Sequence, residues 1–355
     1  MLKERDAVLD ALKGIAMLMI VAIHTGIGNL PGIVGVIGSS GGAGVQIFFV
    51  ISSFLTFSSM QKKIDLNDGE YLKKSYKFIA TRIVRLLPLY YVCMAAYLLL
   101  GFIFGKEVSA MNVLLHALCL HGLHPWYINT FILAGWYLGT LVLFFVALPL
   151  IRKIACSAAR TLWLIIGWSI VWEQLSRTNI IVNIFPNDDY WTTWLQNQSI
   201  FEQLPVFLVG ILMVYLWNVP KLICERVERK KVIHMFMPMI AGCCIVLWSL
   251  INYKINVLGI SYYTVYAMLI MIITLLLKCY SDFFANLHGL CWIGRNTYPI
   301  YLFHFIFANF YDFFMMNMQI AGNLKYVIKF VMVFSISCIW AGIIGEVKKR
   351  IYVKR

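Results

Sequence analysis

The chain has 355 residues, of which 61% are hydrophobic and 13% are charged. A soluble domain has about a quarter of its residues charged, so the composition excludes an ordinary soluble protein. Apolar runs close to the length of a transmembrane helix recur from one end to the other. The sequence therefore predicts an all-α fold, a polytopic bundle of transmembrane helices.

The apolar runs divide the chain into about ten expected spans. They lie near residues 8–27, 42–60, 85–104, 127–151, 161–179, 201–218, 234–251, 259–278, 297–316 and 326–346. The polar stretches between them are short, so we expect a single integral-membrane domain over residues 1–355 and no soluble domain.

The net charge of +14 is unevenly distributed among the connecting segments. With the N-terminus in the cytoplasm, 25 of the 30 basic residues fall on the inner side, as the positive-inside rule requires. We therefore expect both termini in the cytoplasm, and no nucleic acid is needed to explain the charge. The nine cysteines show no metal-ligand spacing, so no metal site is expected.

The first expected span contains the stretch "LKGIAMLMIVAIH", which has Lys13 near one end and His24 at the other. Eleven helical residues rise by roughly 16 Å over three turns, so both side chains lie on one helix face. Asp10 shares that face and is expected to pair with Lys13 or with a basic residue on a neighbouring helix. Ionisable groups inside a span are costly and usually functional, although Lys13 alone also fits a side chain that reaches the membrane interface.

Four further stretches carry polar groups in or beside apolar runs. Arg82 and Arg85 in "RIVRLLPLYY" share a helix face, an arrangement typical of a phosphate clamp and equally of a flank that contacts lipid headgroups. Ser52 in "GVQIFFVISSFLTF" lies within a span, where serine often bonds to a backbone carbonyl.

Of the other two stretches, one leads into the expected span 297–316 and the other lies at the outer membrane interface. "IGRNTYPIYLFH" places Arg295 at the inner interface, with Tyr301 and His304 on one face further in. Trp136 lies near the start of "AGWYLGTLVLFF" at the outer interface, where tryptophan is ordinarily a membrane anchor. The segment 111–126 contains three histidines and is expected to be a re-entrant or interfacial helix.

The order of these stretches resembles the integral-membrane acyltransferase family 3, a bacterial group that O-acylates polysaccharides and cell-surface glycans. The family's opening, "R…LDGLRG…H", is similar to Arg5, "LDALKG" and His24. The family stretch "GVDLFFVLSGF" is similar to "GVQIFFVISSF", and its Arg-x-x-Arg followed by "YPLY" is similar to Arg82 and Arg85 with "LPLYY". The family stretch "HGL…P…GGWSL" is similar to "HGLHPWYINTFILAGWYL". The last family motif, "LGRISYSLYLWH", is similar to "IGRNTYPIYLFH".

This resemblance implies an enzyme that transfers an acyl group, usually acetyl, from cytoplasmic acyl-CoA to a hydroxyl of a surface polysaccharide or lipid-linked sugar. The resemblance also implies a location in a bacterial inner membrane and no permanently bound cofactor. Either the membrane domain completes the transfer alone, or a separate periplasmic partner completes it. The sequence departs from the family pattern in three places. Lys13 replaces the family's arginine, and Ser53 replaces the family's glycine. Apolar residues around 140–142 replace a pair of glutamates.

Within that function, Lys13, Arg82, Arg85 and Arg295 are predicted to bind the phosphates of acyl-CoA, and His24 to act as general base. Imidazole, with an ordinary pKa of about 6.5, is neutral and accepts protons at cellular pH. His304 is predicted either to assist or to make a structural hydrogen bond, with Asp10, Ser52, Trp136 and Tyr301 in support. A transporter of a lipid-linked sugar or small solute, or a non-catalytic sensor, is the alternative.

Overall fold

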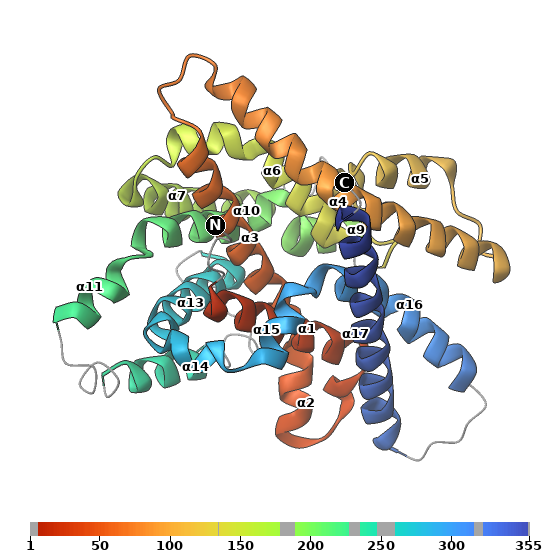
Figure 1. Cartoon of the computed structure of the whole chain (residues 1–355). Helices are drawn as coiled ribbons and strands as arrows, with labels where there is room; N and C mark the ends of the chain where they lie inside the picture. The colour runs from red at the N-terminus through yellow and green to blue at the C-terminus, as the bar shows by residue number, and fades with distance from the viewer. Residues whose placement is uncertain are drawn as a thin grey trace. The chain divides into compact units, whose positions relative to one another are not determined.

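A computed structural model describes residues 6–133, 135–177, 189–226, 235–246, 260–315 and 322–353. These residues form helices joined by turns and contain no β-strand, so the predicted all-α class is confirmed for the described part of the chain (Figure 1). The helices are α1 (Ala7–His24), η1 (Ile27–Asn29), α2 (Gly32–Ser39), η2 (Ser40–Gly42), α3 (Ala43–Lys63), α4 (Tyr71–Ile103), α5 (Ala110–Ala117), η3 (His121–Leu123), α6 (Trp136–Ile154), α7 (Ala158–Arg177), α9 (Asp189–Thr193), η4 (Trp194–Gln198), α10 (Ile200–Leu216), α11 (Val219–Arg226), Met235–Val246, α13 (Tyr262–Leu277), η5 (Lys278–Tyr280), α14 (Ser281–Ala285), α15 (His288–Arg295), α16 (Thr297–Met315) and α17 (Leu324–Val353).

Seven stretches of the described residues are long and apolar enough to cross a membrane. They are Ala7–His24, Gly32–Lys63, Tyr71–Ile103, Trp136–Ile154, Trp191–Leu216, Tyr262–Ala285 and Leu324–Arg350. The multi-pass character is therefore confirmed, whereas the count of ten and the cytoplasmic position of both termini stay predictions.

The three expected spans outside this set correspond to more polar or shorter helices. Helices α7 and α16 occupy the expected spans 161–179 and 297–316 at nearly full length, but they contain more polar side chains. The expected span 234–251 contains the short helix Met235–Val246, and its remaining residues from 247 lie outside the described part.

Two helix starts differ from the sequence-based boundaries. Helix α4 begins at Tyr71, well before the expected start near residue 85, because its first turns carry charged side chains that no apolar-run criterion includes. Helix α6 begins at Trp136 and not near residue 127, and the preceding residues form turns. Arg82 and Arg85 therefore lie well inside one long helix.

The chain divides into two compact units, each built from separate segments. The first unit comprises Met1–Phe48, Ile240–Tyr253 and Leu276–Arg355, and the second comprises Phe49–Met239 and Lys254–Leu275. In the first, α1 packs against α15 and α16, and α16 packs against α17; in the second, α10 packs against α6 and α7.

Helix α1 has defined signals at both ends. The side chain of Asp6 accepts hydrogen bonds from the backbone N–H groups of Val8 and Leu9, which lack partners inside the helix. At the other end the Thr25 hydroxyl donates to the Val21 carbonyl, and Gly26 adopts a left-handed φ of 82°. Asp6 therefore caps the start of α1, and Thr25 with Gly26 ends the helix at His24.

Candidate functional site

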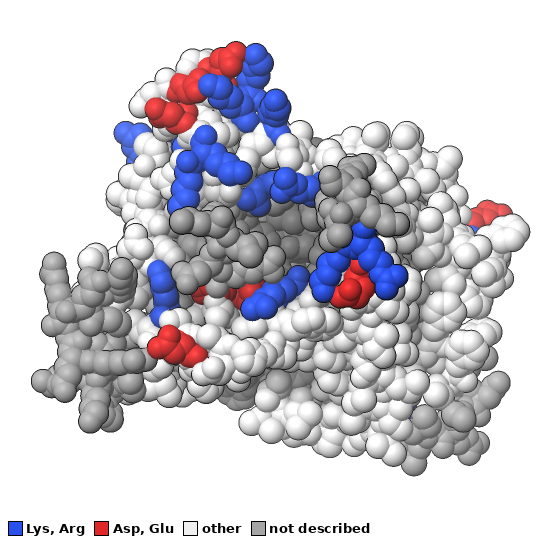
Figure 2. Space-filling model, in the orientation of Figure 1, with Lys and Arg blue, Asp and Glu red and all other residues white. Residues whose placement is uncertain are grey.

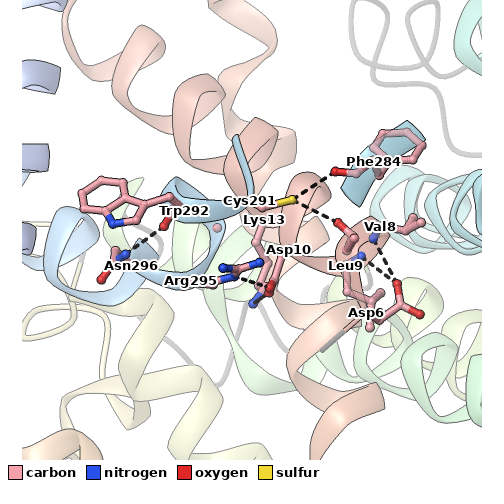
Figure 3. A network of polar contacts seen from close by, with 12 residues as sticks. Asp6, Val8, Leu9, Asp10, Lys13, Phe284, Cys291, Trp292, Arg295 and Asn296 are labelled. Atoms are coloured by element: carbon pink, nitrogen blue, oxygen red, sulfur yellow. Dashed lines mark hydrogen bonds and ion pairs between the residues drawn. The ribbon is translucent and has the colours of Figure 1, made fainter. Parts of the chain in front are cut away.

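An ion-pair cluster lies at the N-terminal end of α1 (Figure 3). The Asp10 carboxylate accepts from Lys13 Nζ at 2.7 Å on one oxygen and from Arg295 Nε at 3.0 Å on the other. The Asp10 side chain is 7% exposed, whereas Lys13 is 20% and Arg295 45% exposed. Both partners predicted for Asp10 are therefore found, and two cations converge on one buried carboxylate.

Close backbone packing between α1 and α15 brings Arg295 to Asp10. A Cβ on Gly294 would lie 1.7 Å from the carbonyl oxygen of Asp10, and a Cβ on Gly14 would lie 2.4 Å from the carbonyl oxygen of Leu290. Only glycine permits backbones this close. The glycines of "LKG" and "IGR" thus place the neighbouring charged residues within ion-pair distance.

The opposite end of α1 holds His24, which is half-buried in the last helical turn. Its ring centroid lies 5.4 Å from that of His304 and 4.3 Å from that of Phe305 on helix α16. No hydrogen bond within the described residues uses the His24 imidazole. The ring is therefore held by aromatic packing, and its nitrogens are available to a ligand.

His304 is fully buried, and its orientation is fixed by its own helix. Its Nδ1–H donates to the Tyr301 carbonyl oxygen at 2.6 Å, which leaves Nε2 as the ring atom that can accept a hydrogen bond. Nε2 has no hydrogen-bond partner within the described residues. The structural hydrogen bond considered for His304 is thus present at one nitrogen, while the second nitrogen is a buried acceptor beside His24.

In the second unit, Ser52 and Trp136 belong to one aromatic cluster. The Ser52 hydroxyl and the Tyr137 hydroxyl are 3.3 Å apart, and the ring of Phe49 stacks on Tyr137 at 5.0 Å and meets Trp136 edge-on at 5.7 Å. The backbone-carbonyl bond expected of a serine in a span is made by Ser53, which donates to the Val50 carbonyl. Trp136 therefore packs within the unit.

Arg82 and Arg85 lie on α4 of the same unit and differ in exposure. Arg82 is half-buried, donates from Nη1 to the Thr56 hydroxyl at 3.3 Å, and has its guanidinium 4.9 Å from the ring centroid of Phe78. Arg85 is exposed. Neither forms an ion pair within the described residues, so both guanidiniums retain donors for an anion.

The segment predicted as a re-entrant or interfacial helix holds a polar cluster whose pairing the sequence does not reveal. It is helical only over α5 and η3, and the rings of His116 and His121 stack there at 4.0 Å. His116 Nδ1 is 2.8 Å from the Tyr90 hydroxyl and its Nε2 is 2.9 Å from the Tyr127 carbonyl, while His121 Nε2 bonds to the Gly135 carbonyl at 3.0 Å. His116 and His121 thus form a structural hydrogen-bonding centre.

This histidine pair predicts a loss of stability in acid. Burial lowers the pKa of His116 to about 3 and that of His121 to about 4, whereas unfolded histidine titrates near pH 6.5. The unfolded chain therefore binds more protons below about pH 6.5, and stability falls as the pH drops toward the lowered values. Thermal unfolding of the detergent-purified protein between about pH 7.5 and 5 measures this, and H116Q/H121Q is expected to lose part of the dependence. Parallel pH profiles for the two proteins would contradict the prediction.

A second centre that sequence reasoning misses surrounds Glu202 on α10, which is 3% exposed. Its carboxylate accepts from Trp172 Nε1 at 2.9 Å and from the Ser261 hydroxyl. A glutamate in the first turn of an otherwise apolar helix is the available sequence signal, because a buried carboxylate requires partners.

One of the three comparisons with known proteins identifies a family. The family model of the acyltransferase domain matches residues 6–345, nearly the whole chain. A search of curated proteins finds no match, and a search of solved structures finds none either. The protein is a membrane acyltransferase, and it transfers groups other than amino-acyl groups. The chain belongs to the acyltransferase family 3.

Proposed function

We propose that the enzyme transfers an acyl group, acetyl in the simplest case, from cytoplasmic acyl-CoA to a hydroxyl of a surface polysaccharide or lipid-linked sugar in a bacterial inner membrane. The observation that carries the proposal is the pair formed by His24, whose ring nitrogens bond to nothing else described, and His304, oriented by the Tyr301 carbonyl. A free imidazole beside a second, oriented imidazole suits proton removal from an alcohol.

In the proposed reaction, a ring nitrogen of His24 accepts the proton of the acceptor hydroxyl as its oxygen attacks the thioester carbonyl. The tetrahedral intermediate then expels the CoA thiolate, which takes up a proton, and the new C–O ester bond replaces the C–S bond. The Nε2 lone pair of His304 is available to accept a hydrogen bond from the acceptor or from protonated His24. Buried donors and acceptors with fixed orientation stabilise such charge changes more than water does.

The ends of α1 suggest how the donor is arranged along the first unit. His24 follows Lys13 by 11 positions, a rise of roughly 16 Å that is comparable to the length of an extended pantetheine arm. Lys13 and Arg295 at one end are cations suited to phosphate, although Asp10 partly neutralises them. We propose that the anionic handle of acyl-CoA lies at this end and its thioester near His24.

Transfer of label from acetyl-CoA by the purified enzyme to a glycan or lipid-linked sugar tests this function, and mass spectrometry of surface glycans from a deletion strain identifies the acceptor. A purified, folded enzyme that neither hydrolyses acetyl-CoA nor transfers its acetyl group would refute the proposed donor. Direct transfer without an added partner would show that no separate periplasmic protein is needed.

The proposed phosphate clamp predicts a donor-binding defect in R82A/R85A. Each guanidinium can donate two parallel hydrogen bonds to a phosphate, and neither is engaged in an ion pair within the described part of the chain. We expect the apparent KM for acetyl-CoA to rise by roughly tenfold or more, with a smaller change in kcat. R82K/R85K keeps the charge, so its KM is expected to lie between that of the wild type and that of R82A/R85A. An unchanged KM in R82A/R85A would dismiss the clamp.

A further inference from the structure

A cavity of about 420 Å³ lies in the second unit, away from the aromatic cluster of Ser52. Residues from the C-terminal end of α3 and the following turn, from the end of α6 and from α10 line it. Its charged side chains are Lys62, Lys63, Arg152 and Asp65, so cations outnumber the single carboxylate. Figure 2 shows Lys and Arg side chains, interspersed with acidic ones, gathered over the turn that joins α3 to α4. The volume falls within the range of small-molecule sites.

Arg152 gives the cavity a buried positive charge. The residue is 5% exposed, and its guanidinium donates to the Met60 carbonyl at 3.3 Å and the Ile64 carbonyl at 2.7 Å while lying 5.5 Å from the Tyr71 ring centroid. The carbonyls at the end of α3 carry partial negative charge, but no carboxylate pairs with Arg152 within the described residues. Buried charges are ordinarily neutralised by a charged partner. An anion bound in the cavity would be such a partner for Arg152.

The one acidic residue of the cavity wall does not take this role. Asp65 is exposed, and its Oδ1 accepts from the backbone N–H of Asn67 at 3.0 Å within its own turn. Lys62 and Lys63 are also exposed, and they lie outside every ion pair of the described residues. Their ammonium groups are therefore free to turn toward a bound anion.

A shared aromatic ring connects the cavity with Arg82. The Phe78 ring centroid lies 5.8 Å from Lys63 Nζ and 4.9 Å from the guanidinium of Arg82. Lys63 and Arg82 therefore both lie near the Phe78 ring, so positive charge is present between the rim of the cavity and the predicted clamp. A ligand with several phosphates could contact both.

We infer that this cavity is a phosphate-binding subsite that holds one of the several phosphates of acyl-CoA, with Arg152 at its base and Lys62 and Lys63 at its rim. The inference rests on the proposed donor. A phosphate on an anionic lipid headgroup has the same chemistry, and the experiment distinguishes the two sources.

The test compares K62Q/K63Q with K73Q/K74Q, a matched control. Lys73 and Lys74 are exposed, pair with Glu70 and Asp68, and do not line the cavity. Because all four lysines are exposed, both variants are expected to fold. One arm measures binding of coenzyme A without acceptor to the purified full-length protein at low and high salt. The other arm measures binding of labelled phosphatidylglycerol in phosphatidylcholine nanodiscs.

For a nucleotide phosphate, K62Q/K63Q weakens coenzyme A binding by roughly five- to thirtyfold at low salt, less at high salt, while K73Q/K74Q binds as the wild type does. If the cavity holds a lipid headgroup, K62Q/K63Q shows the same loss only in the binding of phosphatidylglycerol, and its binding of coenzyme A is unchanged. Equal affinities of the two variants in both arms would overturn the subsite. Wild-type protein that binds no coenzyme A would instead refute the proposed donor, so the two failures are distinguishable.

Discussion

Replacing His24 with Ala or Gln is expected to lower the rate of acyl transfer by a factor of about 10² to 10⁴, the usual contribution of a general base. The imidazole is the proposed proton acceptor, and neither replacement supplies a basic nitrogen. His304 is held by the Tyr301 carbonyl at 2.6 Å, so its ring is not expected to move into the vacated position. Transfer from labelled acetyl-CoA under saturating donor measures the effect.

The matched control for this variant is His288→Ala. His288 is exposed at the start of α15 and forms no part of the histidine pair, so its loss is expected to leave transfer unchanged. Size-exclusion chromatography of both variants checks folding. If H24A is folded and transfers at the wild-type rate, His24 is not the base.

Replacing Gly294 with Ala is expected to destabilise the protein by about 3 kcal/mol, at the upper end of overpacking effects. The added Cβ would lie 1.7 Å from the Asp10 carbonyl oxygen, which is backbone and cannot rotate away. Helix α15 must therefore move from α1, and the Arg295–Asp10 ion pair at 3.0 Å is lost with it. Thermal unfolding in detergent measures the change.

Gly289 on the same helix provides the control. A Cβ at Gly289 meets nothing within 4 Å, and alanine favours helix over glycine by about 1 kcal/mol. G289A is therefore expected to be as stable as the wild type or slightly more so. Equal unfolding temperatures for G294A and G289A would show that the close approach of α1 and α15 does not hold in the folded protein.

Several parts of the site are predictable because they depend on local sequence. The helical spacing of Asp10 and Lys13 predicts their ion pair, and the structure confirms it at 2.7 Å. The motifs "LDALKG" and "IGRNTYPIYLFH" predict the family, which the match over residues 6–345 confirms. These features follow from neighbours along one helix or from linear order.

Other parts require elements far apart in sequence. No spacing rule reveals that Arg295 rather than another cation joins Asp10, since that depends on the contact of Gly294 with α1. The same holds for the stacked pair of His116 and His121 and for the buried Glu202 with Trp172. The count of ten spans depends on apolar runs alone, and helices such as α16 show that a long helix can carry polar residues within such a run.

By itself, the sequence determined that this protein is helical, multi-pass and an acyltransferase of family 3, because apolar run length, charge distribution and motif order are properties of the linear chain. Only the tertiary structure decided which side chains meet: that His304 faces its own helix carbonyl with one nitrogen and keeps the other beside His24, and that Arg152 is buried at a cavity. Side-chain partners depend on how helices pack, and packing depends on contacts between residues hundreds of positions apart.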